Sequence, residues 1–180
     1  MKYYHVSTQL HEGYQIIPSQ KSFLGWSRYA ENAKVLEENE FIEVFNYLKA
    51  SDVEIKTGRR PQKWLCEILF ENIRKQYYSN RPSRIYGTYL CKDLDEAMQF
   101  NQLYRKGKAS IFEVDIDENV VFFDMNIFTR AETSLDSISD NTFASCVNLA
   151  HYYWSSAGEE SITQKEYIYD QPIIIGKKIL

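Results

Sequence analysis

Three short segments of this 180-residue chain carry side chains that could act on one substrate. The first segment holds His5 and Ser7, the second holds Tyr89, and the third holds Glu166. An imidazole and a hydroxyl can form hydrogen bonds, a phenol ring can stack on another ring, and a carboxylate can stabilise a developing positive charge. Taken singly, each segment is an ordinary strand or strand–helix joint, and a lone histidine in a strand is more often structural.

The pattern of apolar side chains predicts the elements that position these residues. Strands are predicted at 2–7, 85–90, 111–116, 120–123, 166–170 and 173–180. A turn at 117–119 connects the third and fourth of these strands, and a short extended piece is predicted within 13–21. Helices are predicted at 33–48, 62–78, after Asp93 and around 143–153, and a loop at 51–61. Asp93 and Glu96 fit a capping box, in a helix that would bury Leu94, Ala97 and Met98. The order of elements is an α+β pattern.

The three segments together resemble the ADP-ribosyltransferase superfamily, in its poly(ADP-ribose) polymerase and diphtheria-toxin branch. The stretch His5-Val6-Ser7 resembles the His-Gly-Ser strand of that branch, and Ile16-Ile17-Pro18 is similar to the segment that follows it. Gly87-Thr88-Tyr89-Leu90 resembles the Gly-Ile-Tyr-Phe strand. The stretch from Glu166 to Asp170 resembles the element with the catalytic glutamate. The segments occur in the family order and cover about a third of the chain.

The chain departs from the family pattern at several positions. The interval from His5 to Tyr89 is longer than in the family, and Val6 stands in place of a glycine. Phe100 stands near the position of a second ring-stacking tyrosine. Gln164 and Glu166 also fit the Gln-x-Glu turn of the other transferase branch, which uses an arginine on the first strand; His5 favours the histidine branch.

The resemblance implies an NAD-dependent ADP-ribosyltransferase that releases nicotinamide and uses NAD as its substrate, with no metal. It implies that Glu166, His5 and Tyr89 are catalytic. His5 would hold the adenosine ribose, Ser7 the nicotinamide amide, and Tyr89 would stack on the nicotinamide ring with Phe100 as its partner. It also implies a fold with a split antiparallel β-sheet core and flanking helices, as one domain over residues 1–180 with a helical insertion at about 31–80.

Composition and motifs exclude several other classes. The three cysteines are far apart and form no CxxC pair, and no HExxH or His/Cys/Asp cluster is present, which argues against a metal site or a disulfide framework. No GxGxxG, Walker or GxSxG motif occurs. No signal peptide or membrane span is predicted. The expected location is the cytoplasm, or the cytosol of a target cell if the protein is a toxin.

A basic segment could bind a macromolecular acceptor, which is a protein or a nucleic acid. Residues 56–84 hold eight basic against two acidic residues, in a chain of net charge -4. The residues predicted to contact the acceptor are Arg59, Arg60, Arg81, Arg84 and Gln164. The alternative is that these charges pair with the preceding acidic stretch or face solvent.

Two other functions remain open. An RNA 2'-phosphotransferase-like enzyme would need further basic residues in the cleft. The other function is a catalytically silent module that binds NAD or ADP-ribose. The presence of His5, Tyr89 and Glu166 disfavours this function. The acceptor and the oligomeric state are left undetermined.

Overall fold

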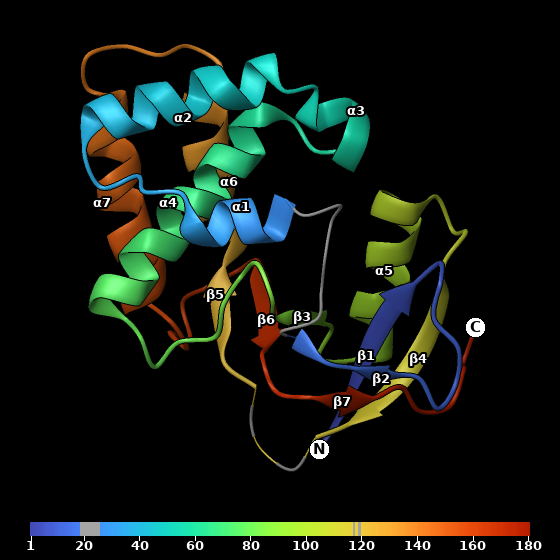
Figure 1. The fold of residues 1–180 in the computed structure, drawn as a ribbon. Coiled ribbons are helices and arrows are strands. Elements are labelled where there is room, and N and C mark those ends of the chain that lie inside the picture. Colours follow the sequence, from blue (N-terminus) through green and yellow to red (C-terminus); the bar gives the residue numbers. More distant parts are fainter. Residues whose placement is uncertain (19–25, 117, 119) are drawn as a thin grey trace. The chain divides into compact units, whose positions relative to one another are not determined.

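A computed structural model describes residues 1–18, 26–116, 118 and 120–180. The chain forms two compact units (Figure 1). Unit 1 comprises residues 1–20, 87–122 and 166–180, and unit 2 comprises residues 21–86 and 123–165. The predicted helical insertion at about 31–80 therefore falls inside unit 2, which also takes in a second, later part of the chain. The end of the predicted extended piece, at 19–21, and the centre of the predicted turn, at 117 and 119, lie outside the described residues.

Unit 1 is built from short strands in small sheets, as an α+β chain requires. Strand β1 (Lys2–Ser7) pairs antiparallel with β4 (Ser110–Asp115), and β2 (Gln15–Ile16) pairs antiparallel with β7 (Ile173–Ile174). In the third sheet β3 (Thr88–Leu90) pairs antiparallel with β6 (Lys165–Tyr169). Strand β5 (Phe122–Asp124) spans the position in the chain where unit 1 ends and unit 2 resumes.

The last residues of the chain continue the pairing of β4. The N–H of Gly176 donates to the carbonyl of Glu113, and a β-bridge joins Phe112 to Lys178. A Cβ atom at position 176 would lie 2.8 Å from the carbonyl oxygen of Glu113, so only glycine permits this approach. The predicted strand at 173–180 is thus β7 followed by a segment that pairs with β4.

A single β-bridge joins β1 to β3. The N–H of Tyr4 donates to the carbonyl of Cys91 at 2.9 Å, and the N–H of Cys91 donates to the carbonyl of Tyr4 at 2.8 Å. Within the described residues this pair is the whole of the ladder between the two strands. The two strands therefore meet at one point instead of forming a continuous sheet.

Two apolar clusters cover the opposite faces of β1. Tyr3 belongs to the larger cluster, with Leu90, Phe112 and Tyr167 among its members. Val6 belongs to the smaller one, with Ala97, on α5 (Leu94–Arg105), among its members. Alternate residues of a strand point to opposite faces, so α5 covers the Tyr4 and Val6 face, and α5 lies beside β1 and β4 in Figure 1.

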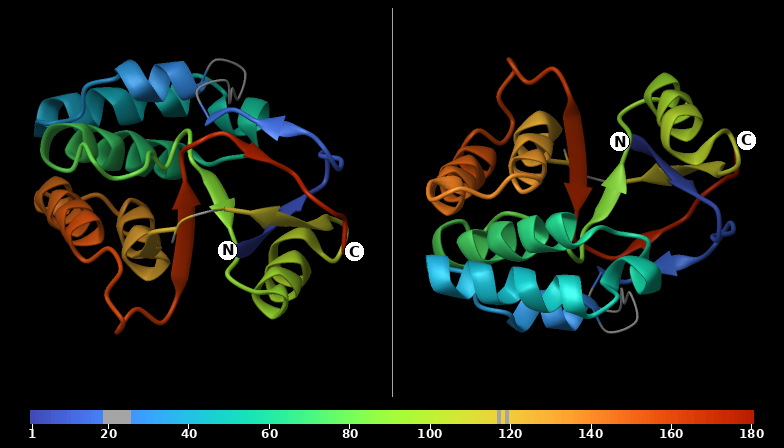
Figure 2. Two further views of the ribbon diagram at one scale, coloured as in Figure 1. Left: turned by 90° about the horizontal axis from the view of Figure 1, so that it is seen from below. Right: turned by 90° about the horizontal axis from the view of Figure 1, so that it is seen from above.

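Unit 2 is helical, and α4 (Pro61–Tyr77) is its central element. Helix α4 contacts four others: α1 (Trp26–Asn32), α2 (Glu38–Ala50), α6 (Met125–Ser134) and α7 (Thr142–Ser155). A short helix, α3 (Val53–Thr57), follows α2, and the two views of Figure 2 show α2 running alongside α4. Nine residues of α4 are buried, which is what a helix surrounded by other helices requires.

A buried ion pair lies in the core of unit 2. The Arg84 guanidinium pairs with the Glu67 carboxylate at 3.0 Å, and both side chains are almost completely buried. Arg84 also donates to the Tyr153 hydroxyl at 2.6 Å and lies 3.8 Å from the centre of the Phe128 ring. Burial raises the pKa of the Glu67 carboxyl, but the positive charges of Arg84 and Arg59 outweigh it, so the net pKa is lowered.

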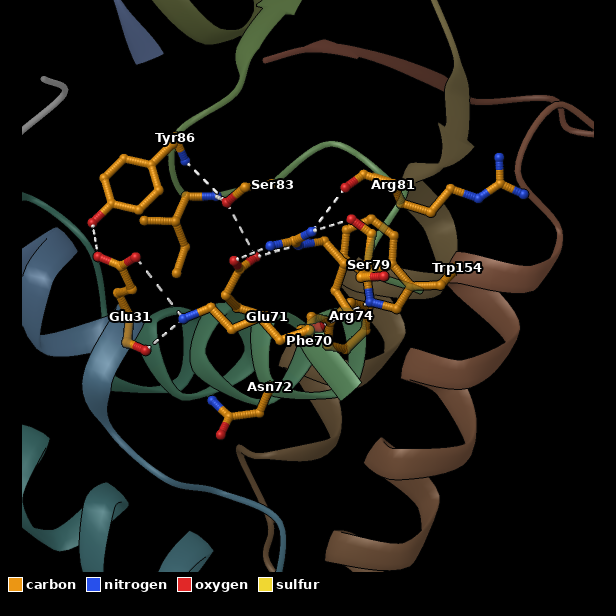
Figure 3. Close-up of polar contacts among 12 residues, drawn as sticks. Glu31, Phe70, Glu71, Asn72, Arg74, Ser79, Arg81, Ser83, Tyr86 and Trp154 are labelled. Atoms are coloured by element: carbon orange, nitrogen blue, oxygen red, sulfur yellow. Dashed lines mark hydrogen bonds and ion pairs between the residues drawn. The ribbon is translucent and has the colours of Figure 1, made fainter. Parts of the chain in front are cut away.

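A second polar network secures the end of α4 to the following segment (Figure 3). The Arg74 guanidinium forms two bonds to the buried carboxylate of Glu71, and Ser83 donates to the same carboxylate. Arg74 also donates to the carbonyl of Arg81. The carboxylate thus receives donors from two parts of the chain, which satisfies a charge that would otherwise be costly to bury.

The elements differ from the predicted ones in several places. Helix α2 begins at Glu38, not Ala33, because Glu37 and Glu40 form a capping box at its start. Helices α1, α3 and α6 were not predicted, and α3 occupies the predicted loop. Asp93 caps α5 as predicted, but the Glu96 carboxylate accepts from the N–H of Lys92 instead of Asp93. Met98 is 40% exposed, so the prediction that it is buried was wrong.

We predict that Arg84→Met lowers the free energy of unfolding of unit 2 by about 3–5 kcal/mol, because it leaves the Glu67 charge buried and unpaired. All three tryptophans, Trp26, Trp64 and Trp154, lie in unit 2, so tryptophan fluorescence during urea unfolding reports this unit. The exposed Arg130→Met is the matched control and should change the free energy by less than about 0.5 kcal/mol. Equal effects of the two substitutions would contradict the prediction.

The same ion pair predicts a dependence on pH. Because the pKa of Glu67 is lower in the folded protein, its contribution is complete above the unfolded value of 4.5 and is lost as the pH falls through the folded value. The difference in stability between wild type and a Glu67→Gln variant should therefore shrink as the pH is lowered below 4.5. A difference that stays constant over this range would show that the Glu67 charge contributes nothing.

Candidate functional site

The structure brings His5 and Tyr89 together from strands that are 84 positions apart in the chain. The Nδ1 atom of His5 lies 2.9 Å from the carbonyl oxygen of Tyr89. A carbonyl only accepts hydrogen bonds, so Nδ1 carries the proton, and in the neutral ring Nε2 is an acceptor. The imidazole therefore occupies a defined position next to the β1–β3 bridge.

Glu166 lies on the strand that pairs with the Tyr89 strand. Tyr89 is directly opposite Ile168, and Glu166 is two positions before Ile168 on β6. Because residues two apart on a strand point to the same face, the side chains of Tyr89 and Glu166 share a face of this sheet. The pairing therefore places the predicted catalytic carboxylate two residues along β6 from the residue opposite the predicted ring-stacking residue.

Strand alternation puts the remaining predicted residues on the other face. His5 and Ser7 alternate with Tyr4 and Val6, so they share a face with Tyr3. Tyr3 packs in the cluster that contains Leu90, which is on the face opposite to Tyr89. A single ligand can therefore contact His5, Ser7, Tyr89 and Glu166 only where β1 and β3 separate beyond their single bridge.

Ser7 and Phe100 have identifiable neighbours. Ser7 is partly buried, and its hydroxyl accepts a hydrogen bond from the N–H of Gln9, so the hydroxyl proton can be donated elsewhere. Phe100 packs against the smaller apolar cluster under α5, and its ring centre lies 5.0 Å from that of Tyr104. The role of Phe100 as a partner of Tyr89 stays a prediction.

The structure corrects the role predicted for Arg84. Its side chain is buried and paired with Glu67, and its hydrogen bond to Tyr153 points it further into the core. A surface cation that binds an acceptor must be accessible, and Arg84 is not. It is a structural residue of unit 2.

The other predicted acceptor residues lie in or beside unit 2 helices. Arg60 pairs with Glu132 and Asp136, at 2.9 Å and 3.2 Å. The Arg59 guanidinium lies 5.5 Å from the centre of the Trp64 ring, and Arg81 is partly exposed. Gln164 is exposed, and its carbonyl accepts from the N–H of Met125. These positions leave their predicted role untested.

The positive charge of the 56–84 segment is largely balanced within unit 2. Four of its eight basic residues pair with acidic side chains: Arg60, Arg74, Lys75 and Arg84. Over the whole unit, 14 basic against 15 acidic residues give a net charge of -1. Only the Lys75 pair, with Glu31, is to the preceding acidic stretch, and the other partners are Glu67, Glu71, Glu132 and Asp136. Unit 2 as a whole is not basic.

The part of the chain that the structure describes gathers no group of three His, Cys, Asp or Glu side chains able to hold a metal ion. An open cavity of about 330 Å³ lies in unit 1 between α5, β4 and the C-terminal residue. None of the residues predicted to form the site lines this cavity. None of the described helices combines the length and the apolar character needed to cross a membrane.

Thr88 precedes Tyr89 on β3, and sequence reasoning did not single it out. Its side chain is completely buried in β3, and its hydroxyl has no hydrogen-bond partner among the described residues. One sequence signal could have drawn attention to it: Thr88 stands where the Gly-Ile-Tyr-Phe strand of the similar family has an isoleucine. Pattern alone does not show whether a buried hydroxyl has a partner.

Cys91, next to the candidate site, is predicted to be unreactive. Burial raises its pKa to about 12, and the negative charges of Glu96 and Asp93 add to the shift. We expect Ellman's reagent to label native protein at pH 8 very slowly, and all three cysteines after denaturation. The prediction would be contradicted if one thiol of the native protein reacted as fast as free cysteine and this reaction were lost in Cys91→Ser.

A search of curated proteins found no match to this chain. A family model described as "Protein of unknown function (DUF2441)" matches residues 3–180, which includes His5, Tyr89 and Glu166. The match spans nearly the whole chain and covers residues of both units. The chain therefore belongs to the DUF2441 family.

Proposed function

We propose that this protein is an NAD-dependent ADP-ribosyltransferase that transfers ADP-ribose to a macromolecular acceptor and releases nicotinamide. One observation carries the proposal: three strands far apart in sequence, each with one residue of the suspected triad, are neighbours in unit 1. The Tyr4–Cys91 bridge joins the His5 strand to the Tyr89 strand, and strand pairing joins the Tyr89 strand to the Glu166 strand.

This neighbourhood is not a necessary result of an α+β fold. Strands β1, β3 and β6 are separated by long intervals, and sequential strands are neighbours more often than distant ones. The resemblance to ADP-ribosyltransferases requires these three strands to lie together, and it rests on short sequence motifs alone. Their adjacency therefore supports the proposal independently of the motifs.

The reaction breaks the bond between the nicotinamide nitrogen and C1 of the ribose. The bonding electron pair leaves with the ring nitrogen, which gives neutral nicotinamide, and positive charge develops on the ribose. A nucleophilic atom of the acceptor then bonds to C1 and loses its proton. The leaving group is cationic before it departs, so the reaction needs no acid to protonate it.

In this proposal the Glu166 carboxylate stabilises the positive charge on the ribose. Tyr89, on the same strand face, stacks on the nicotinamide ring, and the Nε2 atom of His5 accepts a hydrogen bond from a ribose hydroxyl. Ser7 donates its hydroxyl proton to the nicotinamide amide. The acceptor is a protein or a nucleic acid, and the near-neutral charge of unit 2 gives no preference for a nucleic acid.

We predict that wild type releases nicotinamide from NAD and that Glu166→Gln lowers the rate at least about a hundredfold, because it removes the charge that stabilises the transition state. Nicotinamide is measured by chromatography, with and without cell lysate as a source of acceptor. Glu12→Gln removes an exposed carboxylate of the same unit and should leave the rate unchanged.

The outcomes separate the competing functions. NAD binding without nicotinamide release, under any condition, would favour a silent binding module. No NAD binding at all would refute the proposed triad. Loss of a 2'-phosphate from an RNA substrate in the presence of NAD would instead identify an RNA 2'-phosphotransferase.

A further inference from the structure

The positive charge of unit 1 is gathered on the two segments that line its open cavity. Residues 97–112 and 171–180 include every residue that lines the cavity, and they hold five of the unit's seven basic residues and none of its ten acidic residues. All five basic side chains are exposed: Arg105, Lys106, Lys108, Lys177 and Lys178. Unit 1 as a whole is therefore acidic, but the segments around its cavity are positive.

Two of these cations lie next to the cavity without an acidic partner. Lys106 and Lys108 flank Gly107, which lines the cavity, and neither forms an ion pair with any residue that the structure describes. The next acidic residue along β4, Glu113, already pairs with Lys2 at 2.9 Å. The positive charge at this place is therefore available to an anionic ligand.

The folding of unit 1 does not by itself account for this gathering of cations. Lys106 ends α5 with a φ of 55°, in the left-handed region, where glycine or asparagine is the usual residue. The end of a helix attracts a cation, but Lys177 and Lys178 lie on a different segment and gain nothing from this helix end. A ligand with negative charge gives the cations of both segments a common role.

The cavity that these segments surround has an apolar lining. Ala109 and Ile111 are buried members of the smaller apolar cluster and form its floor. Met98 and Leu180, which are 40% and 55% exposed, stand at its edge. The Asn101 amide also lines the cavity, but its oxygen and its nitrogen are both bonded to the backbone of Ala109, at 3.1 Å and 2.8 Å. A ligand that enters the cavity therefore meets mainly hydrocarbon.

We propose that this cavity binds an acidic peptide segment, with one large apolar side chain of the peptide in the cavity and its carboxylates near the surrounding cations. A volume of about 330 Å³ is at the lower end of the range for ligand sites and has room for one leucine or phenylalanine side chain. A nucleobase fits the lining less well, because its ring nitrogens and exocyclic groups need hydrogen-bond partners. Among the lining side chains, only the Gln102 amide is available for this.

This inference goes beyond the proposed function and does not depend on it. Peptide binding in the cavity requires neither NAD nor any of the residues assigned to the NAD site, since none of them lines the cavity. It can therefore be measured in the absence of NAD.

The probes are fluorescein-labelled peptides in which a run of glutamates lies on each side of one central leucine, methionine or phenylalanine. Binding to the full chain is measured by fluorescence anisotropy. At least one peptide should bind with a dissociation constant below about 100 μM at low salt, and binding should weaken about tenfold at roughly 0.3 M salt, because the attraction between exposed charges is screened. The same peptide with a central serine should bind at least about fivefold more weakly, because it leaves the cavity unfilled.

Two pairs of matched variants locate the binding site. Met98→Glu puts a carboxylate at the edge of the cavity and should weaken peptide binding at least about tenfold. Leu103→Glu makes a similar change at a 64% exposed position of α5 that does not line the cavity, and should stay within about threefold of wild type.

Lys106→Gly removes a charge next to the cavity and also relieves the left-handed conformation, so the melting temperature should not fall while peptide binding weakens about threefold or more. Lys178→Gln also removes one charge, but Lys178 is opposite Phe112, whose side chain packs on the other face of β4 from Ile111. This control should change the affinity by less than about twofold.

Three results would overturn the inference. The first is that none of the three peptides binds. The second is that the serine peptide binds as tightly as the others, or that Met98→Glu and Leu103→Glu bind equally well, since the cavity would then not be used. The third is that a labelled single-stranded oligothymidylate binds more tightly than every peptide, which would assign the positive surface to nucleic acid. A thermal melt of each variant by circular dichroism confirms that the compared proteins are folded.

Discussion

Two backbone hydrogen bonds between Tyr4 and Cys91 determine how the candidate site is assembled. They are the whole of the ladder between β1 and β3 in the described structure, and they join the first strand of the chain to a strand about 85 residues later. Next to them, the His5 side chain contacts the carbonyl of Tyr89 where a regular sheet would have a backbone donor. The imidazole thus compensates locally for the separation of the strands, and a change at His5 would affect the backbone as well as any ligand.

This separation also constrains the proposed chemistry. Alternation along the strands directs His5 and Ser7 to one face, and Tyr89 and Glu166 to the other. One NAD molecule can meet both sets only beside the bridge, where β1 and β3 are not joined. The proposed site therefore requires a short bridge, because a continuous β1–β3 ladder would put the two sets on opposite sides of a closed sheet.

Unit 2 is stabilised by charged residues whose sequence pattern predicted a binding surface. Glu67 and Glu71 lie on one helix, α4, and each receives a guanidinium, from Arg84 and Arg74 respectively. Burying these carboxylates without partners would be strongly destabilising, so Arg74 and Arg84 are needed as their partners. The number of basic residues in a segment thus says little about its surface until their partners are known.

The sequence predicted what depends on local pattern. Strand β1 was predicted with its correct bounds, and α4 to within one residue, because their apolar side chains repeat regularly. In α5, Leu94 and Ala97 pack on the buried side as predicted, and Met98 does not. Asn101 is buried on that side as well and bonds to the backbone of Ala109, which an apolar pattern cannot reveal. Helix α6 was missed because its buried residues, Ile127, Phe128 and Ala131, span little more than one turn, which is too short a pattern to single out a helix.

Long-range features were beyond the reach of local pattern. Nothing in the sequence near Tyr4 or Cys91 indicates that they pair, and only the resemblance of three motifs anticipated that their strands are neighbours. The burial of Arg84 could not be predicted either, because its partners Glu67 and Tyr153 come from different parts of the chain. The division into two units follows from such contacts as well.

The most direct test of the central claim is a crystal structure of Glu166→Gln grown with NAD, since this substitution should leave the substrate intact. The account predicts NAD beside the Tyr4–Cys91 bridge, with its nicotinamide ring against Tyr89, its carboxamide at Ser7, and a ribose hydroxyl at position 166. NAD bound elsewhere on the protein, or no bound NAD at a saturating concentration, would contradict the assignment of these strands as an NAD site.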